Sequence, residues 1–205
     1  TEYGHPAEVI ADVFNCSVAE AEDIISQIAA SRTSDANTPA CAEDPMPSRN
    51  SDFTAALEAY LRHLAADRHA AVPETSRYGY LQTLLNAAGE QLTGQRVHAV
   101  IHPANSGAGI PDFGLYAAQQ PDDARPQHGV IEAKPTSADV RAIARSEQVR
   151  GYLHHYRLVL VTNYFQFLLV TLGDDGQPRL EEEYRLAESE AAFWQASQNP
   201  RQLAR

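Results

Sequence analysis

The segments GIPDFGLY, residues 109–116, and GVIEAKP, residues 129–135, each place charged residues inside an apolar run of strand length. Successive side chains of a strand point to opposite faces of a sheet, so Glu132 and Lys134 are expected on one face, opposite to Ala133. A carboxylate and an ammonium group are costly to bury in an apolar strand without a purpose. The second segment is therefore the first place to look for a functional site.

Asp112 follows a proline in the first segment, and pairing of the two strands as a hairpin would bring it to the same end of the sheet as Glu132 and Lys134. Two carboxylates suit Mg²⁺, which prefers oxygen ligands and keeps several waters. A neighbouring ammonium group can orient a water molecule and stabilise negative charge. Lys134 is the only lysine among 16 basic residues, and the wide guanidinium of arginine is a poor substitute for it in so compact a role.

Outward from these segments, the apolar spacing predicts an α/β (α+β) domain with the order α-β-β-β-α-β-β and a mixed sheet. The expected elements, in chain order, are helices at 52–68 and 75–92, strands at 96–102, 110–117 and 129–134, a helix from Ser137 to about Tyr152, strands at 157–162, 165–172 and 179–186, and a terminal helix around Phe193 and Trp194.

The first 60 residues differ in composition from the rest. They carry 11 acidic and two basic residues, whereas residues 61–205 carry 16 acidic and 14 basic residues. Apolar stripes predict an acidic pair of short helices in residues 1–31, an N-terminal helical appendage. The segment 32–51, rich in Ser, Asp, Asn and Pro, is expected to be a flexible linker to a domain at 52–205.

Composition also excludes some classes of protein. No apolar run approaches the roughly 18 residues of a membrane span, and TEYGHPAEVI at the start lacks the pattern of a signal peptide, so we expect a cytoplasmic protein. The net charge of −11 belongs mostly to the N-terminal segment. The near-neutral remainder does not exclude contact with DNA, but it lacks the general attraction of a strongly basic protein.

Pro111-Asp112, followed after 19 residues by Glu132-Ala133-Lys134, resembles the motif of the PD-(D/E)xK nuclease superfamily. The resemblance implies a restriction-endonuclease-like core, a central mixed sheet flanked by helices, over residues 74–172. It implies a Mg²⁺-dependent DNA endonuclease, with Mn²⁺ as a substitute metal, that hydrolyses phosphodiester bonds and leaves 5′-phosphates. Asp112, Glu132 and the carbonyl of Ala133 would bind the metal, and Lys134 would position the attacking water.

Members of this superfamily often add a carboxylate from the first helix, for which Glu74 fits best and Glu90 less well. Many also carry a glutamine and a tyrosine four residues apart on the helix after the motif. Gln148 and Tyr152 match this pattern, and their spacing puts them on one helical face. The resemblance implies that these two residues lie behind the metal ligands or face DNA.

Residues 72–196, including ETSRYGYLQTLLNAAG, SEQVRGYL and LVTNYFQFLLV, are similar to the N-terminal nuclease domain of single-chain restriction–modification enzymes of type IIG and type ISP. Those proteins continue into an adenine-N6 methyltransferase and a target-recognition domain. The resemblance implies DNA as a partner, those two domains on the same or a partner chain, and a role in restriction or anti-phage defence. A homo-oligomer is compatible with it.

Other interpretations stay open. Asp112 alone can be a turn residue, Glu132 and Lys134 a solvated ion pair on an edge strand, and Glu74 a residue that favours a helix start. Gln148 and Tyr152 can simply pack. A function of another class is a catalytically inactive nuclease-like scaffold that binds DNA or docks a protein. The intact set of Asp112, Glu132 and Lys134 favours the enzyme, because a scaffold that does not cleave tends to lose it.

Overall fold

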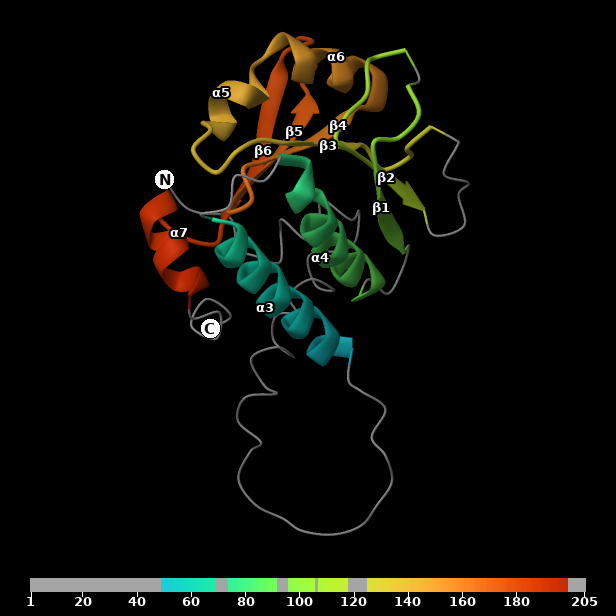
Figure 1. Cartoon of the computed structure of the whole chain (residues 1–205). Coiled ribbons are helices and arrows are strands. Elements are labelled where there is room, and N and C mark those ends of the chain that lie inside the picture. Colours follow the sequence, from blue (N-terminus) through green and yellow to red (C-terminus); the bar gives the residue numbers. More distant parts are fainter. Residues whose placement is uncertain (1–48, 69–73, 92–95, 106, 118–124, 199–205) are drawn as a thin grey trace, which may run out of the picture.

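The described strands of the chain form one six-stranded mixed sheet in the order β1-β2-β3-β4-β5-β6 (Figure 1). The structure, a computed structural model, describes residues 49–68, 74–91, 96–105, 107–117 and 125–198. The helix pair expected in residues 1–31 and the expected linker up to residue 48 lie outside these ranges. An α+β fold with a mixed sheet and flanking helices is confirmed.

The strands pair as the hairpin argument requires. They are β1 (Val97–Ile101), β2 (Phe113–Ala117), β3 (Val130–Ala133), β4 (Leu158–Thr162), β5 (Gln166–Leu172) and β6 (Pro178–Arg185). Neighbouring strands are antiparallel except for β3 and β4, which are parallel. A parallel pair needs a long crossover, and helices α5 and α6 supply it.

Helices cover both faces of the sheet (Figure 1). On one face lie α3 (Arg49–Asp67), α4 (Tyr78–Gln91), which a short 3₁₀ turn at Glu74–Arg77 precedes, and α7 (Glu190–Ser197). On the other lie α5 (Val140–Ala144) and α6 (Glu147–Tyr156). No helix of the described residues is long and apolar enough to cross a membrane.

Two apolar clusters follow from the alternation of side chains along the central strands. Ile131 and Ala133 of β3 pack with α3, α4 and α7, whereas Val130 packs with α5 and α6. Leu160 and Val161 of β4 divide between the two clusters in the same way. Because the period is two, Glu132 and Lys134 belong to the face that α5 and α6 cover.

Several boundaries differ from the sequence prediction. Helix α3 begins at Arg49, inside the expected linker, and β2 begins at Phe113 instead of residue 110. The single helix expected from Ser137 is two helices. Asp139 caps the first by accepting hydrogen bonds from the backbone N–H groups of Arg141 and Ala142, and Ser146 caps the second. Each cap offers the backbone a new helix start, so the chain turns between them.

Candidate active site at the ends of β2 and β3

Glu132 and Lys134 form an ion pair at the C-terminal end of β3. Glu132 is 1% exposed, and its Oε1 lies 2.5 Å from Nζ of Lys134, whose side chain remains one-third exposed. β3 is an interior strand of the sheet, so the interpretation as a solvated pair on an edge strand is wrong. The partly exposed lysine thus neutralises a carboxylate that is buried.

Asp112 lies immediately before β2 and is held beside this pair. The register Phe113↔Ile131 between β2 and β3 brings its carboxylate to the backbone N–H of Ala133, which donates to Oδ2 at 2.8 Å. The backbone N–H of His102 donates to the Asp112 carbonyl at 2.9 Å. The hairpin therefore brings Asp112 to the peptide group between Glu132 and Ala133, at the end of the sheet where the sequence predicts a site.

The hydroxyl of Tyr78 donates to Oδ1 of Asp112 at 2.5 Å. Tyr78 is the first residue of α4 and is 5% exposed. Sequence reasoning missed this residue, because an aromatic side chain in a helix start has the pattern of an ordinary core residue. The one available signal was its position four residues after Glu74, one helical turn along the chain.

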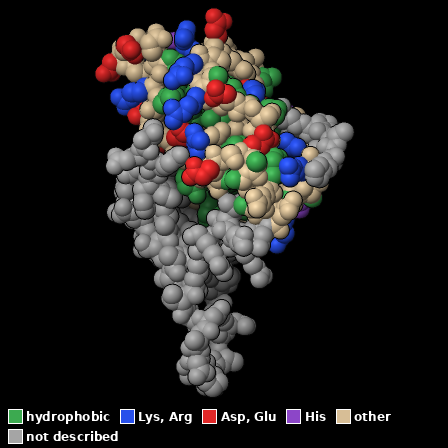
Figure 2. All heavy atoms as spheres, turned by 90° about the vertical axis from the view of Figure 1, so that its left-hand side faces the viewer, with side chains coloured by type: hydrophobic (Ala, Val, Ile, Leu, Met, Phe, Trp, Pro, Cys, Tyr) green, Lys and Arg blue, Asp and Glu red, His purple; other side chains and the backbone are tan. Residues whose placement is uncertain are grey.

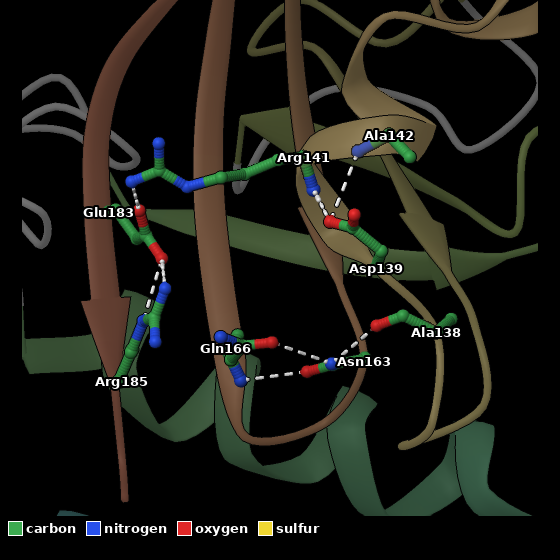
Figure 3. A network of polar contacts seen from close by, with 8 residues as sticks. All are labelled: Ala138, Asp139, Arg141, Ala142, Asn163, Gln166, Glu183 and Arg185. Carbon is green, nitrogen blue, oxygen red and sulfur yellow. Dashed lines mark hydrogen bonds and ion pairs between the residues drawn. The ribbon is translucent and has the colours of Figure 1, made fainter. Parts of the chain in front are cut away.

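The segment after Lys134 is fixed to the turn between β4 and β5. The backbone N–H of Lys134 donates to the Thr162 carbonyl at 2.8 Å and so continues the parallel ladder. The side-chain amide of Asn163, which is fully buried, donates to the carbonyls of Thr136 at 3.3 Å and Ala138 at 2.9 Å. Figure 3 shows Asn163 between Ala138 and Gln166. These hydrogen bonds fix the backbone of Lys134 and of the segment that follows it.

Tyr152 reaches the site from α6, on the other face of the sheet from Tyr78. Its hydroxyl donates to the Ile110 carbonyl at 3.2 Å and accepts from Nε2 of Gln148 at 3.1 Å. Burial raises the pKa of Tyr152, and the carboxylates of Glu132 and Asp112 raise it further, while Gln148 and Lys134 act in the opposite direction. The Tyr152 hydroxyl is thus neutral, and it lies close enough to Asp112, Glu132 and Lys134 for their charges to affect its pKa.

The two helix acids weighed from the sequence occupy different places. Glu74 begins the 3₁₀ turn that leads into Tyr78, so its backbone is one turn from a residue that contacts Asp112; its side chain is not among those described. Glu90 is exposed near the C-terminal end of α4. Twelve residues separate it from Tyr78, roughly 18 Å along a helix, so Glu90 does not belong to the site.

Two basic side chains, one from α5 and one from β6, are engaged with the same acid. Arg141 of α5 and Arg185 of β6 both pair with Glu183, as Figure 3 shows. Figure 2 shows Lys and Arg side chains interspersed with Asp and Glu over the described part of the face that it presents. This face therefore offers no large field of one sign to attract a polyanion.

The described acids alone do not form a cluster of three. Within the described ranges, no group of three or more His, Cys, Asp or Glu side chains lies close enough together to hold a metal ion. The described acidic side chains at this end of the sheet are Asp112 and Glu132, and Glu74 begins the turn that leads into Tyr78. Comparison of the chain with protein-family models, with curated proteins and with solved structures gave no match.

Proposed function

We propose that the protein is a Mg²⁺-dependent DNA endonuclease with a PD-(D/E)xK core. The observation that carries the proposal is the arrangement at the end of β3: Glu132, buried, is paired at 2.5 Å with the chain's only lysine, and the peptide N–H between Glu132 and Ala133 holds the Asp112 carboxylate. Two carboxylates and one ammonium group on adjoining strand ends match the needs of phosphodiester hydrolysis.

The donor set suits a hard divalent cation. Both oxygens of Asp112 accept one hydrogen bond each, from Tyr78 and from Ala133, and a carboxylate oxygen has a second lone pair for another partner. Mg²⁺ needs only one or two protein carboxylates, because waters and substrate phosphate complete its shell. Asp112 and Glu132 would hold it, with the Ala133 carbonyl as a third protein ligand and Glu74 completing the acidic group.

Bound Mg²⁺ would supply polarisation of the scissile phosphate and a more acidic water. The chain's own residues do the rest. Lys134 keeps a charged head at the solvent side of Glu132, where its N–H groups can orient a water molecule and stabilise the charge that develops on the phosphate. Gln148 and Tyr152 fix the Ile110 carbonyl, and with it the segment that leads into Asp112.

The biological setting that we propose is restriction–modification or anti-phage defence. The chain has a net charge of −11, and acids and bases are interspersed on the face in Figure 2, so its own attraction for DNA is weak. A nuclease of this kind depends on other domains to bring it to DNA. Methyltransferase and target-recognition domains, on the same or a partner chain, would fill that role.

The test is cleavage of supercoiled plasmid DNA at low ionic strength with Mg²⁺, Mn²⁺ or EDTA. Wild type is compared with Asp112→Ala and Lys134→Ala, and with Glu147→Gln, which removes an exposed acid from the first turn of α6. We expect nicking that requires the metal, disappears in the first two variants and persists in the third. Inert wild type, or equal cutting by all four proteins, would contradict the proposal and favour a scaffold without catalysis.

A further inference from the structure

The Asp112 carboxylate is held at both oxygens by donors from two different elements. Tyr78 at the start of α4 donates to Oδ1 at 2.5 Å, and the Ala133 N–H at the end of β3 donates to Oδ2 at 2.8 Å. Rotation of the carboxylate about its Cβ–Cγ bond would break both hydrogen bonds. Of the two donors only the tyrosine is a side chain, and it is therefore the one that a substitution can remove without disturbing the strand pairing.

Tyr78 is itself held in a fixed place. It is 5% exposed, and its ring packs against Phe113 with centroids 5.1 Å apart and edge-on against His102 at 5.5 Å. Phe113 follows Asp112 in the chain, and the His102 backbone N–H binds the Asp112 carbonyl. The ring thus contacts both neighbours of Asp112 in the β1–β2 hairpin, so the position of the hydroxyl relative to the carboxylate is determined by packing.

We propose that Tyr78 is a positioning residue that orients the Asp112 carboxylate for a divalent cation. This inference rests on the proposed function, because it assumes that Asp112 is a metal ligand. A carboxylate whose rotation is already restricted loses less freedom when the cation binds. Hydrogen-bond partners of metal ligands contribute about 10- to 100-fold to metal affinity in other proteins, and we expect the Tyr78 hydroxyl to contribute within this range.

The experiment measures Mn²⁺ binding to the full chain without DNA, by electron paramagnetic resonance of the free ion. Tyr78→Phe removes the hydroxyl and keeps the ring. Tyr60→Phe is the matched control, because Tyr60 is 1% exposed on α3 and its hydroxyl donates a 2.6 Å hydrogen bond to the Tyr164 carbonyl instead of to an acid. Asp112→Asn reports whether the metal binds where we propose. Urea unfolding of each variant measures its stability.

We expect Mn²⁺ binding to be lost in Asp112→Asn, to weaken about 10- to 100-fold in Tyr78→Phe, and to stay within about twofold of wild type in Tyr60→Phe. If Tyr78→Phe binds Mn²⁺ like wild type while Asp112→Asn does not, the inference fails and the metal site stands. Equal weakening by both tyrosine variants would also overturn it. If wild type and Asp112→Asn behave alike, the proposed metal site fails, and the inference fails with it.

A second measurement does not depend on how well Tyr78→Phe folds. 3-Fluorotyrosine at position 78 of the otherwise unchanged chain gives a ¹⁹F resonance beside the hydroxyl. Addition of Mg²⁺ should shift this resonance, because the partner of the hydroxyl becomes a metal ligand, and the shift should be absent in Asp112→Asn. A resonance that does not move while Mg²⁺ binds would overturn the positioning role.

Discussion

Nζ of Lys134 lies 2.5 Å from Oε1 of Glu132, across the end of a central strand, and the lysine covers a carboxylate that is otherwise buried. The pair has two consequences that can be separated. The lysine offsets the cost of a buried charge, and the same ammonium group is the one that we propose to act on water and phosphate. Stability and cleavage should therefore respond differently to the same set of variants.

Lys134→Ala should destabilise the fold by about 1–3 kcal/mol, because it leaves the Glu132 carboxylate without this cation. The double variant Glu132→Gln/Lys134→Ala should recover much of that loss, since it removes the buried charge as well. Cleavage should be absent from both. A double-mutant cycle by urea unfolding measures the coupling. If the double variant is no more stable than Lys134→Ala, the ion pair does not have the role in stability that we assign to it.

Glu74 and Glu90 should differ in their effect on cleavage. Glu74 precedes Tyr78 by one turn, whereas Glu90 is exposed near the other end of α4. We expect Glu74→Gln to reduce metal-dependent nicking by at least about tenfold, within the range for residues that support a metal site, and Glu90→Gln to leave it unchanged. Single-turnover nicking of plasmid DNA measures both. Full activity of Glu74→Gln would remove this acid from the site.

Gly129 lies just before β3, at a place where the structure leaves no room for a side chain. Its φ is +101°, and a Cβ there would lie 2.5 Å from the Leu158 carbonyl oxygen of β4. Gly129→Ala should cost about 2–4 kcal/mol from backbone strain and overpacking together.

Gly151→Ala is the matched control, because Gly151 is exposed on α6 and a Cβ there meets no atom within 4 Å. This change should stabilise the fold by about 0.5–1 kcal/mol. Urea unfolding measures the stability of both variants. Equal effects would mean that the backbones at Gly129 and Leu158 move apart enough to accommodate a methyl group.

His128, just before β3, should make stability depend on pH. Burial lowers the pKa of its imidazole from the ordinary 6.5, and within the described residues its buried Nε2 has no hydrogen-bond partner. As pH falls, His128 of the unfolded chain is therefore protonated before His128 of the folded chain. The contribution of neutral His128 is fully present above the unfolded pKa of 6.5 and is lost as pH falls through the lower pKa of the folded state.

The measurement is the difference in unfolding free energy between wild type and His128→Gln from pH 7.5 to pH 5. We expect wild type to lose stability relative to the variant as pH falls through this interval. A difference that is constant across the interval would show that His128 does not titrate differently in the folded and unfolded chains.

The strands, and the position of Asp112 beside Glu132 and Lys134, were predictable because their signals are local. Period-two alternation put Glu132 and Lys134 on one face, and the turn-bounded apolar run before it put Asp112 near them. The break between α5 and α6 was missed because Ser146, which caps α6, is a residue type that also occurs inside helices, and the local sequence does not show which role it takes.

Tyr78 and Asn163 were missed for another reason. Tyr78 meets Asp112 across 34 residues, and Asn163 meets Thr136 across 27, so both contacts arise only when α4 and the β4–β5 turn pack against the end of the sheet. Neither residue type is unusual in its local sequence. Long-range polar contacts of this kind depend on packing and register, which one sequence read by local pattern does not provide.

The most direct test of the central claim is hydrolysis in ¹⁸O-labelled water. A short DNA duplex is incubated with the protein and Mg²⁺ in H₂¹⁸O, and the products are analysed by mass spectrometry, with Asp112→Ala in parallel. We predict products with one ¹⁸O atom in a new 5′-phosphate for wild type and none for the variant. No labelled product from wild type, or the same yield from Asp112→Ala, would contradict a nuclease centred on Asp112, Glu132 and Lys134.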